Sequence, residues 1–198
     1  GVRNFSIYDD AFLVDPPSLA EPLLDAVIRR KADLAFHCPN GLHLRHITPR
    51  LARLLYRAGF RTLRFGFETV DPDRQASTGG KVNNDHLDAA VRYLCEAGYR
   101  ASDVGVYLMC GLPGQTAEEI EGSIRFVRSL GAKPFLAEYS PIPGTALWPE
   151  AVQSSPYDLA GEPLYHNNTL LPCAIEPLRE TAYRMLKRKA RVPLAETA

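Results

Sequence analysis

Residues 104–116 read Val104-Gly-Val-Tyr-Leu-Met-Cys-Gly-Leu-Pro-Gly-Gln-Thr116, and the prediction for the whole chain starts from them. Residues 104–110 form an apolar run of strand length that is rich in strand-forming side chains. The Gly-Leu-Pro-Gly sequence that follows predicts a turn. Thr116, with Glu119 three residues later, predicts a capping box that opens a helix. A strand, a glycine turn and a helix make half of a βα unit, in which ligands bind at the carboxyl end of the strand.

The same unit recurs along the chain with a period of about thirty residues. We predict strands over residues 4–12, 34–38, 62–67, 104–110 and 133–139. We predict helices that begin at a capping box of Ser18 and Glu21, at Thr48-Pro49, at Asp85 and at Thr116. A long polar loop is expected over residues 70–84. Alternating strands and helices indicate an α/β fold with a parallel sheet, in the form of a partial (β/α) barrel.

The last part of the chain has no strand pattern. It contains an irregular segment over residues 148–172 and one basic helix from about Glu176 to Arg191. We therefore expect two regions, a barrel-like unit over residues 1–148 and a C-terminal extension over residues 149–198.

The composition excludes several classes of function. The 198 residues carry no formal net charge, so they give no electrostatic argument for a nucleic-acid or membrane partner. No apolar run has the length of a membrane span, and no signal peptide is visible. The four cysteines Cys38, Cys95, Cys110 and Cys173 form no Cys-x-x-Cys pair, so no short stretch has the ligand spacing of a zinc or cluster site. Reduced thiols in a cytoplasmic protein are expected.

Chemistry-bearing residues fall where the predicted strands end. The set is Asp9, Asp10, His37, Glu68, Thr69, the turn at 111–114 and residues 139–144. Because parallel strands end on the same edge, we expect these residues on one face of a sheet or barrel. Asp9, Asp10, His37 and Glu68 also allow a metal-dependent hydrolase or aldolase. A non-catalytic barrel that binds a ligand or partner is a third alternative.

Six motifs occur in order along residues 4–148. They are Tyr8-Asp9-Asp10-Ala11-Phe12, Asn40-Gly41-Leu42, Gly66-Phe67-Glu68-Thr69, Gly79 with Lys81, Gly111-Leu112-Pro113-Gly114-Gln115-Thr116 and Pro143-Gly144-Thr145. Together they resemble the radical S-adenosylmethionine (SAM) superfamily. Within it, the sequence is most similar to the branch that often carries a cobalamin-binding domain ahead of the barrel.

The resemblance implies a six-stranded partial (β/α) barrel, of which the five predicted strands would be the second to the sixth. It also implies an iron–sulfur oxidoreductase or transferase that binds SAM and a small-molecule substrate. With a [4Fe-4S] cluster, such an enzyme forms a 5′-deoxyadenosyl radical. The Cys-x-x-x-Cys-x-x-Cys motif of the family is absent from this sequence. We therefore expect the cluster ligands in an N-terminal segment of the parent protein, and cobalamin as a candidate cofactor of the full-length enzyme.

The resemblance also assigns cofactor-binding roles to individual positions. Carboxylates of Asp9 and Asp10 would lie near the SAM ammonium, and Glu68 and Thr69 near the ribose and methionine end. Lys81 would pair with the SAM carboxylate. The adenine would be contacted by Leu108, by the turn of Gly111, Leu112, Pro113 and Gly114, and by Tyr139, Pro141 and Pro143.

Overall fold

The computed structural model describes residues 1–9, 11–174 and 178–192 of the chain. Five strands form one parallel sheet in chain order: β1 Asn4–Ser6, β2 Ala35–His37, β3 Phe60–Glu68, β4 Val104–Cys110 and β5 Lys133–Glu138. Between successive strands lie α1 Ala20–Arg29, α2 Pro49–Ala58, α4 Asn84–Ala97 and α5 Ala117–Ser129. The α/β fold with five parallel strands is therefore confirmed.

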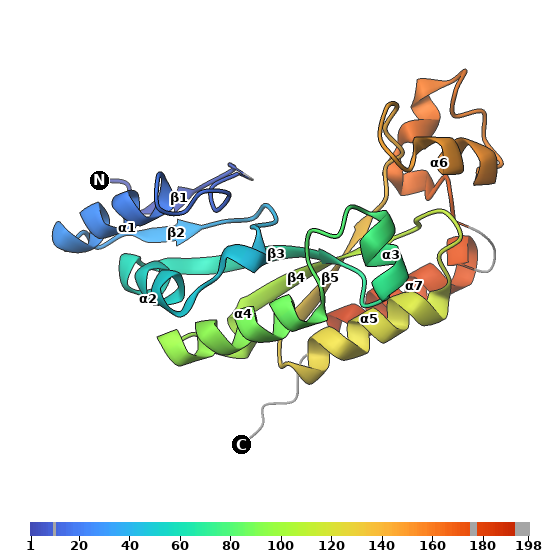
Figure 1. Cartoon of the computed structure of the whole chain (residues 1–198). Coiled ribbons are helices and arrows are strands. Elements are labelled where there is room, and N and C mark those ends of the chain that lie inside the picture. The colour runs from blue at the N-terminus through green and yellow to red at the C-terminus, as the bar shows by residue number, and fades with distance from the viewer. Residues whose placement is uncertain (10, 175–177, 193–198) are drawn as a thin grey trace.

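The two faces of the sheet have different environments. Leu63, Phe65, Val106 and Leu108 are buried in the main core on the side of the helices. Figure 1 shows α4 and α5 along this side of the sheet, together with α7 Tyr183–Arg191, which packs on β5 and α5. Because side chains alternate along a strand, their neighbours point to the opposite face.

That opposite face is only partly covered by the described residues. We call it the inner face and define it by Thr62, Arg64, Gly105, Tyr107, Met109 and Phe135. Apart from the buried Gly105, its residues are half-buried. The pairings Arg64 with Gly105 and Tyr107 with Phe135 place these residues side by side across β3, β4 and β5. In a barrel this is the face that the strands enclose.

Two predicted helix ends are confirmed in detail. The Thr48 side chain accepts a hydrogen bond from the Leu51 amide at 3.1 Å and caps α2. Gly59 ends the helix with φ 92°, and a Cβ atom at this position would lie 2.3 Å from the Leu34 carbonyl oxygen. Only glycine fits there, because both the left-handed backbone and the close approach exclude a side chain.

The N-terminal region differs from the prediction. β1 ends at Ser6, and residues 11–19 are mostly turns, so the predicted strand over residues 4–12 is too long. The predicted capping box of Ser18 and Glu21 is wrong, because α1 begins after Leu19 without a side-chain cap. The Glu21 carboxylate instead pairs with Arg50 of α2 at 3.0 Å. Glu21 therefore makes an ion pair between α1 and α2, and not the predicted capping contact within α1.

The polar loop over residues 70–84 contains an unpredicted helix, α3 Pro72–Ser77. Asp71 caps it by accepting a hydrogen bond from the Arg74 amide at 2.8 Å. The helix has no apolar periodicity for a sequence pattern to detect, since it is short and mostly polar.

The chain after β5 packs around a second, small apolar cluster, which it shares with the sheet edge. α6 Trp148–Ser154 and two short 3₁₀ turns, Pro163–His166 and Asn168–Leu170, surround it. The cluster joins Ala151, Leu159 and Cys173 to Leu112 and Tyr139 at the sheet edge. A π-helical turn, Leu178–Ala182, precedes α7, and the predicted helix start at Glu176 lies outside the described residues. In the described parts of the chain, no helix combines the length and apolarity that crossing a bilayer requires.

Candidate functional site

A cavity of about 360 Å³ opens at the carboxyl ends of β3, β4 and β5. The strand ends supply Glu68, Met109, Leu112, Tyr139 and Ser140. The loops above the sheet supply the remaining lining residues Ser77, Thr78, Gly79, Lys81, Ile142, Thr145, Ala146 and Leu147. The predicted convergence of strand ends therefore holds for these three strands. The cavity combines a carboxylate and an ammonium group with an apolar wall.

Glu68 enters the cavity from a strained backbone. It is the last residue of β3 and has φ 74°, a left-handed conformation that side chains disfavour. The pairing of β3 with β4 shifts register between Gly66 and Glu68, so the strand is irregular at this point. Strain of this kind is concentrated at functional sites.

Gln115 holds the glycine turn after β4. Its side-chain oxygen accepts hydrogen bonds from the amides of Gly111 at 2.8 Å and Leu112 at 3.2 Å. Its amide nitrogen donates to the Met109 carbonyl at 3.1 Å. The buried Gln115 side chain therefore fixes the positions of Met109 and Leu112, which both line the cavity. Sequence reasoning placed this residue in a motif but gave it no role.

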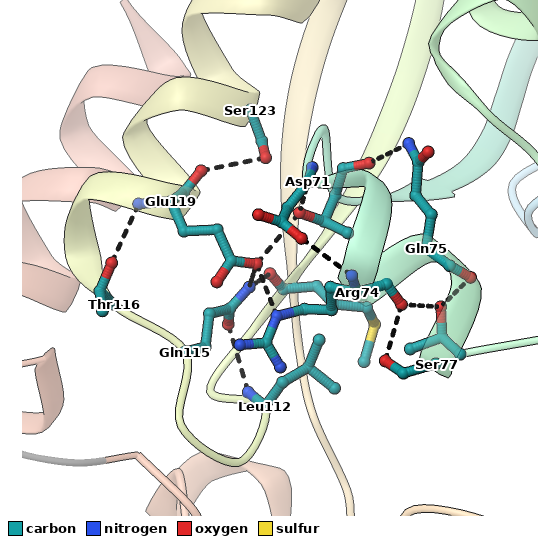
Figure 2. Close-up of polar contacts among 12 residues, drawn as sticks. Asp71, Arg74, Gln75, Ser77, Leu112, Gln115, Thr116, Glu119 and Ser123 are labelled. Carbon is teal, nitrogen blue, oxygen red and sulfur yellow. Dashed lines mark hydrogen bonds and ion pairs between the residues drawn. The ribbon is translucent and has the colours of Figure 1, made fainter.

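A mostly buried ion pair connects the two sides of the site, and we call it the Arg74–Glu119 clamp (Figure 2). The Arg74 guanidinium lies 2.7 Å from the Glu119 carboxylate and also donates to the Pro113 carbonyl at 3.0 Å. The buried Thr69 hydroxyl donates to the same carboxylate at 3.1 Å. The clamp joins α3, the end of β3, the glycine turn and α5.

The clamp also corrects the capping box predicted at the start of α5. Thr116 does cap the helix, because its side chain accepts a hydrogen bond from the Glu119 amide at 3.2 Å. The reciprocal bond from the Glu119 side chain is not formed, since that carboxylate faces Arg74 and Thr69. Neither Arg74 nor the tertiary role of Glu119 was predicted from the sequence.

The predicted SAM-binding residues are distributed between the cavity, its supports and other places. Glu68, Lys81, Leu112 and Tyr139 line the cavity. Thr69, Gly111 and Pro113 lie behind it in the hydrogen bonds that hold its walls. Gly114 is exposed in the turn, with φ 65°.

Four more of the predicted residues, all within the described part of the chain, do not line the cavity. Leu108 is fully buried in the main core, because it points to the helix side of β4, and its neighbour Met109 lines the cavity. Pro141 is buried and Pro143 is exposed, and neither lines the cavity. The exposed Asp9 accepts a hydrogen bond from the Ala11 amide at 2.8 Å. Asp10 lies outside the described residues.

Tyr139 brings a buried phenol to the cavity wall. Burial, with smaller contributions from Cys173 and Glu150, raises the pKa of Tyr139 to about 12, so the phenol is neutral near pH 7. Its hydroxyl is buried and has no hydrogen-bond partner among the described residues. The side chain therefore keeps an unused donor and acceptor next to the site.

The described residues do not provide a metal or cluster site. Cys38, Cys110 and Cys173 are buried, and burial raises the pKa of Cys38 and of Cys110 to about 12, which disfavours the thiolate that iron requires. Nowhere in the described ranges do three His, Cys, Asp or Glu side chains group around a possible ion. The residues present therefore do not fit a [4Fe-4S] cluster, and the described members of the alternative metal site do not converge.

Comparisons with known proteins agree with the fold. The family model of the radical SAM superfamily matches residues 2–127. The uncharacterized methyltransferase PH0819 of Pyrococcus horikoshii is 24% identical over 159 residues, which are 78% of this chain and 33% of that protein.

Two solved enzymes share the architecture. The radical SAM methyltransferase TsrM from Kitasatospora setae, with cobalamin and a [4Fe-4S] cluster bound, has a TM-score of 0.63 and 20% identity over 77% of this chain and 31% of its own. Coproporphyrinogen III oxidase (HemN) from Escherichia coli has a TM-score of 0.55 and 19% identity over 68% of this chain and 32% of its own. The chain spans about a third of the length of each of these proteins.

Proposed function

The chain belongs to the radical SAM superfamily, and we propose that the cavity at the ends of β3, β4 and β5 binds SAM. The observation that carries the proposal is Glu68, a carboxylate placed in the cavity by a strained backbone. A carboxylate accepts hydrogen bonds from both ribose hydroxyls of a nucleoside.

The other lining residues suit the remaining parts of SAM. The Lys81 ammonium pairs with the SAM carboxylate. Met109, Leu112 and Ile142 offer an apolar surface to the adenine, and the glycine turn allows the ring to approach the backbone closely. Asp9 follows β1, whose last residue Ser6 is in register, through His37, with Thr62 and not with Glu68 at the end of β3. The assignment of Asp9 and Asp10 to the SAM ammonium therefore stays a prediction from the resemblance.

The chemistry requires groups beyond the described residues. A [4Fe-4S] cluster would supply the electron that cleaves SAM to methionine and a 5′-deoxyadenosyl group. We propose that the cluster ligands come from a part of the protein outside this sequence, since three of the four cysteines present are buried and the described residues hold no metal-ligating group of three. The role of this chain is then to bind SAM, orient it and exclude water from it.

Methyl transfer is the reaction type that the comparisons favour. PH0819 is named a methyltransferase, and TsrM is a methyltransferase with cobalamin bound. A second TsrM structure contains a tryptophan substrate and a SAM analogue, at a TM-score of 0.57 and 20% identity over 70% of this chain and 28% of its own. We therefore propose a radical SAM transferase that acts on a small molecule and uses cobalamin in the full-length protein.

Glu68→Ala in the full-length protein tests the proposed site. We expect about tenfold weaker SAM binding, because a charge-assisted hydrogen bond is lost. Isothermal titration with SAM measures the change, and iron analysis shows that the cluster content is retained. Glu118→Ala, an exposed carboxylate in the first turn of α5, is the matched control and should bind like the wild type. Unchanged affinity in Glu68→Ala would remove Glu68 from the site.

A further inference from the structure

Arg64 lies flat across the inner face of the sheet. It belongs to β3, and its register partner is Gly105 of β4. Its guanidinium carbon lies 4.3 Å from the centre of the Phe135 ring on β5. The side chain therefore crosses the middle strand and ends on an aromatic face two strands away, an arrangement that favours a cation.

Gly105 provides the space for this crossing. A Cβ atom at Gly105 would lie 2.5 Å from both Cδ and Nη1 of Arg64. Real side chains do not tolerate such a distance, so any other residue would displace the arginine. The Phe135 ring is itself held against Tyr107, at 6.0 Å between ring centres. The position of the guanidinium is therefore fixed by three strands.

The charge of Arg64 is not neutralised by the described residues. No carboxylate among them forms an ion pair with it, and its one hydrogen bond runs from Nη1 to the Leu63 carbonyl at 3.1 Å. Burial lowers the pKa of the Arg64 guanidinium, and the nearby Tyr107 offsets only part of this effect. A guanidinium has five N–H donors, so several remain available to an anion.

Arg64 lies on the same face as the lining of the cavity. Gly105, Tyr107 and Met109 alternate along β4, and Met109 lines the cavity. Met109 is four residue steps along the strand from Gly105, which is about 13 Å. A small molecule that extends from Arg64 toward the cavity would therefore span about this length.

We propose that Arg64 binds a carboxylate or phosphate group of the substrate, while the reacting part of that substrate lies next to the cavity. The planar guanidinium forms paired hydrogen bonds with either group, and Phe135 and Tyr107 present aromatic surface to the adjoining part of the molecule. This inference rests on the proposed function, because it treats the inner face as the substrate side of the SAM cavity.

The test uses the full-length protein saturated with SAM. Benzoate and phenyl phosphate are the anionic probes, and benzamide is the uncharged probe of similar shape. We expect at least one anion to bind about tenfold more tightly than benzamide, because a bond to a charged partner is added. Arg64→Gln should abolish this preference, and Arg64→Lys should restore only part of it, since lysine lacks the planar fork. Arg61→Gln, an exposed position on the same strand, is the matched control.

Three results would overturn the inference: equal binding of the anions and benzamide to the wild type, an unchanged preference in Arg64→Gln, or an equal loss in Arg61→Gln. The comparison of anion and benzamide binding is made on the wild type, so it does not depend on whether a variant folds. A difference between the two anions shows whether the group is a carboxylate or a phosphate. SAM affinity, measured in the same samples, separates this inference from the proposed function. If the wild type binds SAM but shows no preference for the anions, only the inference about Arg64 is contradicted. If the wild type does not bind SAM, the proposed function is contradicted.

Discussion

Glu68 combines a carboxylate that lines the cavity with a backbone conformation that its side chain makes unfavourable. In a left-handed backbone the Cβ atom crowds the following carbonyl, and only glycine avoids that cost. The position at the end of β3 nevertheless carries glutamate, so this side chain lowers the local stability of the strand. At the residue scale, this cost to folding can be measured separately from the proposed role of Glu68 in binding SAM.

Glu68→Gly should therefore stabilise the fold relative to Glu68→Ala. Both variants lack the carboxylate, but only glycine removes the backbone strain, so we expect the free energy of unfolding of Glu68→Gly to be higher by about 1 kcal/mol. Denaturant unfolding of the two proteins measures the difference. Equal stability would mean that the β3 end relaxes out of the left-handed conformation.

At the scale of elements, the Arg74–Glu119 clamp makes α3, the glycine turn and α5 one unit. The two side chains are mostly buried, so removing either one leaves a charge without its partner. The clamp also fixes both walls of the cavity, since the loop after α3 carries Lys81 and the turn carries Leu112.

Arg74→Met and Glu119→Gln should each lower the free energy of unfolding by about 2 kcal/mol. The double variant should lose less free energy of unfolding than the two single variants lose together, because neither charge is then left unpaired. The expected coupling energy is about 1 kcal/mol. A double-mutant cycle by denaturant unfolding measures both effects. Glu118→Gln, on the exposed side of the same helix, is the control and should be nearly neutral. Strict additivity would mean that the pair does not act as a clamp.

The attachment of α7 to β5 should depend on pH. Burial alone would raise the pKa of Glu138, but hydrogen bonds from Lys187 and Tyr183 outweigh it and hold that pKa below 4.5. The hydrogen bond to Glu138 also raises the pKa of Lys187 above 10.5. The stabilisation of the α7–β5 contact by the Glu138 carboxylate is therefore present above pH 4.5 and is lost as the pH falls through the lowered pKa of Glu138. The stabilisation by the Lys187 ammonium is present below pH 10.5 and is lost as the pH rises through the raised pKa of Lys187.

Hydrogen exchange of the α7 amides across this pH range tests the linkage. After correction for intrinsic exchange rates, protection should be highest between the two limits and should fall at both. In Lys187→Met the plateau should be lower and the alkaline loss should be smaller, since only the loss due to Tyr183, whose pKa burial and the hydrogen bond to Glu138 also raise, is left. A protection profile that does not change with pH would show that apolar packing alone holds α7 against β5.

At the scale of the whole molecule, the sheet carries the cavity that we propose for SAM, and its described residues hold no cluster site. A polypeptide of this sequence alone, treated with iron and sulfide, should therefore bind no stoichiometric cluster. Its cysteines are dispersed, and burial raises the pKa of Cys38 and Cys110. Visible absorbance together with iron and sulfide analysis measures the outcome. A full complement of four irons per chain would contradict the assignment of the cluster ligands to another part of the protein.

The sequence by itself determined the order of the five strands and of α1, α2, α4 and α5, the glycine turn after β4 and the caps at Thr48 and Thr116. Neighbouring residues determine these features, because capping, alternation and turn formation depend on side chains only a few positions apart. The sequence also indicated that Glu68, Lys81, Leu112 and Tyr139 belong to one site. The resemblance of their motifs carried that prediction, and the cavity brings the four residues together.

Only the tertiary structure decided which partners these elements find. Glu119 is a capping residue by its spacing, yet its carboxylate bonds Thr69, 50 positions away, and pairs with Arg74. Met109 rather than Leu108 reaches the cavity because the sheet assigns alternate side chains of β4 to opposite faces, and the helices cover only one of them. The crossing of Arg64 over Gly105 to Phe135 depends in the same way on strand register. Such contacts arise from packing between distant segments, and no local pattern in the sequence encodes them.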